Sequence, residues 1–99
     1  MVNFIIMKEN AAASGLVEHF RIDAAGHVLP GSNNTQNLGA TGTRWANIYT
    51  NDLNLSNKGS TNSIDNTWGD FTIQEGESDL FLINNRSGKK YKFNLTEVS

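Results

Sequence analysis

Side chains that can act as acids, bases or nucleophiles are few and widely spaced in this sequence. It contains two histidines, His19 and His27, and no cysteine. Nucleophilic catalysis needs a hydroxyl or thiol beside a positioned base, and no spacing here singles out such a pair. We interpret His19 as a solvated strand residue and His27 as a residue beside a turn, and we expect no catalytic residues and no enzyme activity.

Three carboxylates lie close together at Glu75, Glu77 and Asp79. Glycosidases use a pair of carboxyl groups held in different protonation states. These three fall on an expected hairpin turn, where exposure to water keeps them ionised. We therefore interpret them as a solvated acidic turn.

Metal binding has little support in the sequence. Asp65, Asn66 and Asp70 offer oxygen ligands near Gly69. Their spacing matches no EF-hand loop, and the closing glutamate of such a loop is missing. We expect neither a metal nor another cofactor.

Trp68 is the best candidate for contact with a sugar or another surface ligand. Such sites combine an aromatic face with amide and carboxylate groups, and Asn66 and Asp70 supply these groups beside Trp68. We predict a receptor-binding site at these three residues. The alternative for Trp68 is a structural role at the entry of a strand.

Composition indicates a small domain with a limited core. The chain has 99 residues, 37% of them apolar, and without cysteine it forms no disulfide. Chains of this size often gain stability from oligomerisation. The formal net charge is −2, and no basic surface suited to phosphates is apparent, so we expect no nucleic-acid partner. Residues 1–7 are apolar but too few to span a bilayer, so we expect no membrane insertion.

We divide the chain into three segments, residues 1–29, 30–58 and 59–99. In the first segment, alternating apolar residues predict strands at 2–6 and 16–22, with Leu16, Phe20 and Ile22 on one face. A turn at residues 23–26 then leads to a short return strand at 27–29.

Residues 28–43 form a polar loop with the only proline, three glycines and three asparagines. A loop this polar buries little of itself, so the residues that follow must hold it in place. The expected loop anchor consists of four large side chains, Arg44, Trp45, Ile48 and Tyr49. Their spacing predicts one helical turn at residues 43–47, followed by an extended stretch at 48–56.

The third segment predicts a three-stranded antiparallel meander with strands at 70–74, 79–84 and 90–96. The middle strand is apolar on both faces and therefore needs cover on both. The expected core or oligomer contacts are Leu80, Phe81, Leu82, Ile83, Tyr91, Phe93 and Leu95. Either the N-terminal segment of the same chain or neighbouring copies around a three-fold axis would supply the cover.

The loop and its anchor resemble a segment near the C-terminal ends of bacteriophage tail fibres and tailspikes, where G-x-x-x-P-G-(S/T)-x-N-(T)-x-x-L-G leads into R-W-x-x-(I/V)-Y. The matching residues are Gly26, Pro30, Gly31, Ser32, Asn34, Thr35, Leu38, Gly39, Arg44, Trp45, Ile48 and Tyr49. Such fibres are typically parallel homotrimers, and this favours neighbouring copies as the cover. In many fibres a self-cleaving chaperone domain follows this motif, but the rest of this chain is too short for one. Autoproteolysis is therefore not expected.

Residues 69–98 also resemble the C-terminal ends of phage structural proteins. The two resemblances and the pattern predict an all-β fold, with a short antiparallel meander and a loop-rich N-terminal half, packed as a parallel homotrimer. The implied function is a virion tail fibre or fibre tip that attaches to the host surface. Its expected partners are further copies of itself, other virion tail proteins and a host cell-surface glycan. One alternative is a purely structural virion protein, such as a tail adaptor, fibre cap or capsid decoration protein. Another is a monomeric carbohydrate-binding module.

Overall fold

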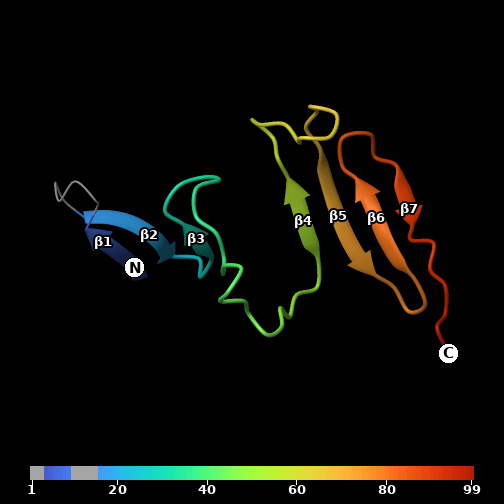
Figure 1. The fold of residues 1–99 in the computed structure, drawn as a ribbon, viewed down its shortest axis with the longest axis horizontal. Helices are drawn as coiled ribbons and strands as arrows, with labels where there is room; N and C mark the ends of the chain where they lie inside the picture. Colours follow the sequence, from blue (N-terminus) through green and yellow to red (C-terminus); the bar gives the residue numbers. More distant parts are fainter. Residues whose placement is uncertain (1–3, 10–15) are drawn as a thin grey trace. The chain divides into compact units, whose positions relative to one another are not determined.

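The fold is all-β. A computed structural model covers Met1–Ser99 and describes residues 4–9 and 16–99, with side chains from residue 17 onward. The described residues form seven strands in two antiparallel sheets and contain no helix (Figure 1). The chain divides into two compact units, Met1–Ala46 and Asn47–Ser99, and each holds one sheet. The prediction of an all-β fold is confirmed. The boundary between the units falls inside segment 30–58.

The helical turn predicted at residues 43–47 is wrong. Ala40 and Thr43 instead form an isolated antiparallel bridge, in which each backbone N–H donates to the carbonyl of the other at 3.1 Å. The chain that follows is irregular up to β4. The helical spacing of Trp45 and Ile48 misleads because so short an apolar run fits an extended chain equally well.

The N-terminal unit contains a sheet in the order β1-β2-β3. Its strands are β1 (Phe4–Glu9), β2 (Leu16–Ile22) and β3 (Val28–Pro30). The strand predicted at 16–22 is confirmed as β2, and the return strand begins one residue later than predicted. The strand predicted at 2–6 overlaps β1, but residues 1–3 lie outside the described part. Asp23 closes the turn between β2 and β3, where its Oδ1 accepts hydrogen bonds from the N–H groups of Ala25 (3.0 Å) and His27 (2.9 Å).

A β-bulge interrupts the alternation of β2. Ile6 pairs with Phe20, but Met7 pairs with Glu18, so His19 has no partner of its own on β1. An extra residue on one strand shifts the faces of the residues before it. The bulge explains why Glu18 forms an ion pair with Arg21, at 2.6 Å between the carboxylate Oε1 and the guanidinium Nη2. In an unbroken strand, residues three apart would lie on opposite faces.

Gly31 closes this sheet next to the bulge. Its N–H donates a 2.7 Å hydrogen bond to the carbonyl of His19. A methyl group on Gly31 would overlap the carbonyl group of Glu18. The glycine of the Pro30-Gly31 pair is therefore needed for the close approach of two backbones, and its φ lies outside the left-handed region.

We predict that Gly31→Ala destabilises the pairing of β2 with β3 by about 1–3 kcal/mol, because one backbone must move to admit the methyl group. Gly42→Ala is the matched control, since a methyl group there meets no atom within 4 Å. Backbone amide hydrogen exchange across β2 and β3 measures the effect. Equal protection in both variants would contradict the prediction.

The C-terminal unit contains a four-stranded antiparallel sheet in the order β4-β5-β6-β7. Its strands are β4 (Leu53–Ser56), β5 (Asp70–Glu75), β6 (Leu80–Asn84) and β7 (Lys90–Lys92). The extended stretch predicted at 48–56 is a strand only in its last four residues. The strand predicted at 90–96 ends at Lys92, although the N–H of Phe93 still donates to the carbonyl of Leu80 at 2.9 Å.

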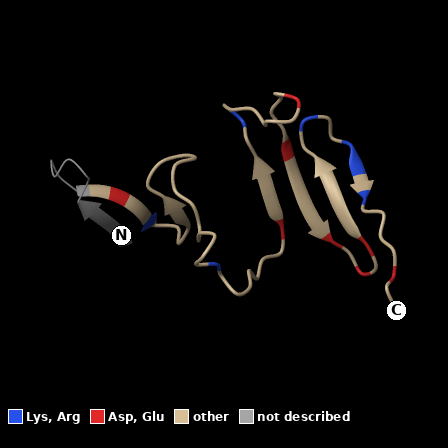
Figure 2. Cartoon of the chain, viewed as in Figure 1, with Lys and Arg blue, Asp and Glu red and all other residues tan. Residues whose placement is uncertain are grey.

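The register of this sheet gathers large apolar side chains on one face. Residues directly opposite each other in paired strands point to the same face. Leu53 pairs with Ile73, Ile73 with Leu82, and Leu82 with Tyr91, so one apolar row crosses all four strands. We define the apolar face as Leu53, Leu55, Phe71, Ile73, Leu80, Leu82 and Tyr91. Charged residues stand at the ends of β5 and are absent from β4 and β6 (Figure 2).

The opposite face of the sheet is largely polar. Phe81 and Ile83 point to this side, where Lys92 and Lys90 stand directly opposite them on β7. Lysine stems can cover apolar neighbours while the ammonium group stays in water. Phe81 also lies against its own turn, because a methyl group on Gly76 would be 2.7 Å from its Cε2. The second apolar side of β6 therefore has local cover.

Residues 17–99 contain no buried hydrophobic side chain. The buried residue among them is Thr72, 8% exposed. Its hydroxyl donates to Asn54 Oδ1 at 2.7 Å and accepts from Asn85 Nδ2 at 2.9 Å. Of the predicted core residues, Leu80, Leu82, Ile83 and Phe93 are half-buried, whereas Phe81, Tyr91 and Leu95 are exposed. None of these seven is buried within a single copy of the chain.

Candidate functional site

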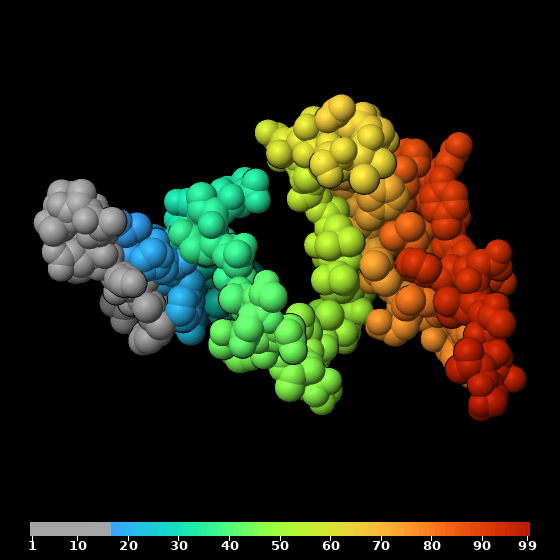
Figure 3. Space-filling view, viewed as in Figure 1, coloured from blue at the N-terminus to red at the C-terminus, as the bar shows by residue number. Residues whose placement is uncertain are grey.

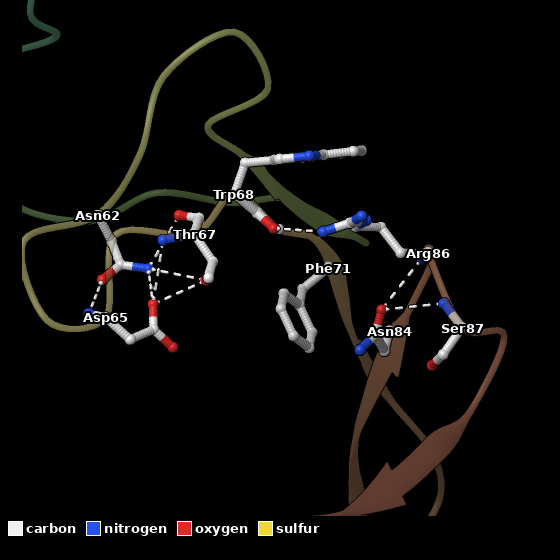
Figure 4. A pocket seen from close by; sticks show the side chains of 9 residues that line it. Asn62, Asp65, Thr67, Trp68, Phe71, Asn84, Arg86 and Ser87 are labelled. Atoms are coloured by element: carbon white, nitrogen blue, oxygen red, sulfur yellow. Dashed lines mark hydrogen bonds between the residues drawn. The ribbon is translucent and has the colours of Figure 1, made fainter.

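A cavity of about 610 Å³ lies at one end of the C-terminal sheet (Figure 4). Loop 57–69, which precedes β5, forms one wall and projects from the sheet as a compact lobe, yellow in Figure 3. The turn after β6 forms the other wall through Asn84, Arg86 and Ser87. Trp68 and Phe71 contribute aromatic surface between the two walls. The cavity thus combines aromatic rings with polar groups that come from two separate turns.

Hydrogen bonds from Asn62 shape the loop wall. Its Oδ1 accepts from the N–H groups of Ile64 (2.7 Å) and Asp65 (2.9 Å), as expected for an asparagine that starts a turn. Its Nδ2 donates to Asp65 Oδ1 at 2.8 Å and to the carbonyl of Thr67 at 3.0 Å. Asn66 adopts a φ of 61°, a left-handed conformation that asparagine tolerates better than most residues.

Asp65 is the carboxylate of the cavity. Its Oδ1 accepts from the hydroxyl of Thr67 at 2.7 Å, from the N–H of Thr67 at 3.2 Å and from Asn62. The Thr67 hydroxyl and then the Asn62 amide hold the pKa of Asp65 below its usual value of 3.8, because both donate to the charged form. Asp65 Oδ2 has no hydrogen-bond partner among the described residues.

Arg86 is fixed on the opposite wall. Asn84 Oδ1 accepts from the N–H groups of Arg86 (3.0 Å) and Ser87 (3.2 Å), which sets the turn that carries the arginine. The Cζ of Arg86 lies 3.8 Å from the centroid of the Trp68 ring, and its Nη1 donates to the carbonyl of Trp68 at 2.9 Å. The Nζ of Lys58 lies 5.8 Å from the same centroid. Trp68 therefore lies close to two cationic side chains.

The structure separates the three predicted receptor-binding residues. Trp68 lines the cavity, whereas Asn66 and Asp70 do not. Asn66 forms the bend of the loop. Asp70 points to the polar face of the sheet, where its Oδ1 accepts from Asn85 Nδ2 at 3.0 Å.

Sequence reasoning missed Arg86, Asn62 and Phe71 as parts of this site and treated Asp65 only as a weak metal ligand. The pattern Asn62-x-x-Asp65-x-Thr67 is a readable signal for a closed turn, because asparagine and aspartate side chains bond to the backbone a few residues on. No comparable signal existed for Arg86, because its contact with Trp68 joins residues that are 18 apart in the sequence.

The predicted loop anchor spans both compact units. Arg44 Nη1 donates to the carbonyl of Thr41 at 2.7 Å. Trp45 lies beside the backbone of Gly39, where an added methyl group would be 3.5 Å from its Cδ1, and its side chain is 64% exposed. Both residues therefore contact the end of the polar loop. Ile48 and Tyr49 belong to the C-terminal unit and are exposed.

The remaining candidate residues are not among those that line the cavity. His19 stands in the bulge of β2, and His27 stands beside the turn before β3. The carboxylates of the β5–β6 turn, Glu75, Glu77 and Asp79, are exposed. Within residues 4–9 and 16–99, no group of three or more histidine, aspartate or glutamate residues is arranged to hold a metal ion. The same residues include no helix that is long and apolar enough to cross a bilayer.

We predict that Thr67→Val raises the pKa of Asp65 towards 3.8, because the hydroxyl is the strongest donor to its charged form. A depressed pKa stabilises the fold above pH 3.8, and this contribution is lost as the pH falls through the folded-state value. An NMR titration of the Asp65 carboxyl carbon measures the midpoint. Ser63→Ala is the control, since Ser63 takes no part in the hydrogen bonds to Asp65. An unchanged midpoint in Thr67→Val would contradict the assignment.

A scan against protein-family models and searches of curated proteins and of solved structures found no match. The likeness of residues 26–49 to phage fibre segments accordingly remains an expectation that rests on those residues.

Proposed function

We propose that the protein is a component of a bacteriophage tail fibre, at or near its tip, that assembles as a homotrimer and attaches to the host surface. The observation that carries this proposal is the apolar face of the C-terminal sheet. The resemblance of residues 26–49 to fibre segments supports the assignment to a phage particle.

The apolar face has no second layer within its own unit. Leu53 is 45% exposed and Tyr91 is 48% exposed, although they stand in a continuous row with Ile73 and Leu82. Antiparallel sheets commonly leave one face in water, but that face is then polar. Here the polar side of the sheet carries Asn54, Thr72 and the lysines of β7. The apolar side is therefore the one that gains free energy when a partner covers it.

The area of this face sets how much free energy its burial supplies. Four strands about 4.8 Å apart, with about five residues each at roughly 3.3 Å, span about 300 Å². Covering such an area is worth on the order of 7 kcal/mol, at roughly 25 cal/mol per Å². A whole small domain is stable by only about 5–15 kcal/mol. Leaving the face wet would thus forfeit an amount comparable with the entire net stability.

Neighbouring copies of the chain are the partner that we favour over the N-terminal unit. The N-terminal unit also has exposed apolar side chains, with Val28 at 67% and Leu29 at 40% exposed. Both units therefore have apolar side chains to cover, and the resemblance to phage fibres, which are typically parallel homotrimers, favours neighbouring copies. A parallel trimer brings the same face of three copies together around one axis, so each copy supplies the cover that the others need.

Host contact is assigned to the cavity at the end of the sheet. It opens beside Trp68 and combines aromatic surface with amide, carboxylate and guanidinium groups, as glycan sites do. Phe71 and Asn84 line it and stand directly opposite each other at the end of the apolar face. In the proposed trimer, the cavity lies at the rim of the interface.

We predict that Leu55→Asp disperses the assembled protein into single chains. Leu55 is 50% exposed in one copy, so the change costs a lone chain little, but a charge buried between copies is strongly unfavourable. Asn54→Asp is the matched control. It adds the same charge at the adjacent position, faces the other way and keeps the oxygen that accepts from Thr72. Sedimentation velocity measures the mass of both variants, and a Leu55→Asp protein that assembles as fully as Asn54→Asp would refute the trimer.

We further predict that the purified protein binds cells of the bacterium in which the phage multiplies and slows adsorption of that phage. Leu55→Asp should lose most of this inhibition, because a single chain cannot engage several receptors at once. Adsorption rates measured with and without added protein provide the test. An assembled protein that neither binds cells nor slows adsorption would favour the purely structural virion role.

A further inference from the structure

Arg86 is a fixed cation without an anionic partner. Its guanidinium lies 3.8 Å from the Trp68 ring centroid and is tied by Nη1 to the carbonyl of Trp68. No carboxylate of the described residues lies within ion-pair distance of it. Its Nε and Nη2 have no hydrogen-bond partner among these residues. A planar guanidinium held in this way is ready to bind a carboxylate or phosphate with two parallel hydrogen bonds.

The charges near Trp68 also favour an anionic ligand. Lys58, which does not line the cavity, brings a second cationic group to 5.8 Å from the ring centroid. The carboxylate of the cavity, Asp65, lies on the opposite wall, and its Oδ1 is occupied by Asn62 and Thr67 (Figure 4). The cavity is therefore positive at the Arg86 wall and offers an acceptor oxygen, Asp65 Oδ2, at the other.

We propose that this cavity binds an anionic sugar unit, a pyranose ring that carries a carboxylate or a phosphate. The acidic group binds Arg86. Ring hydroxyls on the far side donate to Asp65 Oδ2. The apolar C–H face of the sugar packs against the Phe71 ring between the two walls, and a volume of about 610 Å³ admits a sugar residue with part of its neighbours.

The inference deepens the proposed function, because it names the class of receptor for the site at the rim of the trimer. Its polar contacts, Arg86 and Asp65, lie outside the apolar face, whereas Phe71 belongs to that face, and the substitutions below change only a polar contact. Assembly and ligand binding can therefore fail separately. The ligand tests use the assembled full-length protein, with its mass checked by sedimentation for every variant.

The test is isothermal titration calorimetry with three probes. These are an oligosaccharide containing glucuronate, glucose 6-phosphate, and a neutral glucose oligosaccharide as the uncharged comparison. We expect one or both acidic probes to bind and the neutral one to bind at least tenfold more weakly. Affinity for the acidic probe should fall as salt is added, because ionic contacts are screened.

Substitutions locate the acidic contact. Arg86→Gln should weaken binding of the acidic probe by about tenfold or more, and Arg86→Lys should restore part of the loss because it keeps the charge but not the planar fork. Lys92→Gln is the matched control. It removes the same charge from the polar face of the sheet, away from the cavity, and should leave the affinity unchanged.

Each outcome of these titrations supports or overturns the proposed anionic ligand. Equal binding of neutral and acidic probes would overturn the inference, as would binding that Arg86→Gln and Lys92→Gln weaken equally. Absence of binding to all probes by a fully assembled protein would also overturn it, while the trimer would stand. A protein that does not assemble would instead refute the proposed function. Arg86→Gln also removes the contact with Trp68, so a second measurement uses the wild-type protein. The NMR signal of the Trp68 indole N–H is followed as the acidic probe is added. A signal that does not move would count against the inference.

Discussion

The constraint on which the rest of this structure depends is the shortage of a hydrophobic core in a single chain. Residues 17–99 bury no apolar side chain, and the residue that is buried there is Thr72, held by two asparagines. The cross-strand register collects the apolar residues of the C-terminal unit on one face instead. Hydrophobic burial normally supplies most of the driving force for folding. In this chain, the proposed association of copies would supply that burial.

Turns held by side-chain oxygens provide part of the local order that a packed core provides in other domains. Asp23, Asn62 and Asn84 each accept hydrogen bonds from backbone N–H groups two residues and three or four residues further on. Such contacts are local, so they form at little cost in chain entropy and need no packed interior. They explain how a chain rich in asparagine can hold defined loops between short strands.

Two of these turns also create the cavity. Asn62 shapes the loop that carries Asp65 and Trp68, and Asn84 shapes the turn that carries Arg86. The hydrogen-bonded strands β5 and β6 then hold the two turns at the same end of the sheet. The polar groups of the site are thus positioned by the short-range chemistry of each turn and by the pairing of two strands. A rigid scaffold that presents functional residues on loops is a common arrangement in binding proteins.

The sequence by itself determined the all-β class, two strands predicted at 70–74 and 79–84 and found at 70–75 and 80–84, the turn at Asp23 and the exposed acidic turn, because alternation and turn residues act over short distances. It identified Trp68 as a candidate contact, but not the arginine beside it. The tertiary structure alone decided that β4 joins the sheet and that Leu53, Leu55, Phe71 and Ile73 share a face with Leu82. It alone decided that His19 falls in a bulge and that Arg86 meets Trp68. These features depend on register and on contacts between residues far apart in the chain, and no local pattern encodes them.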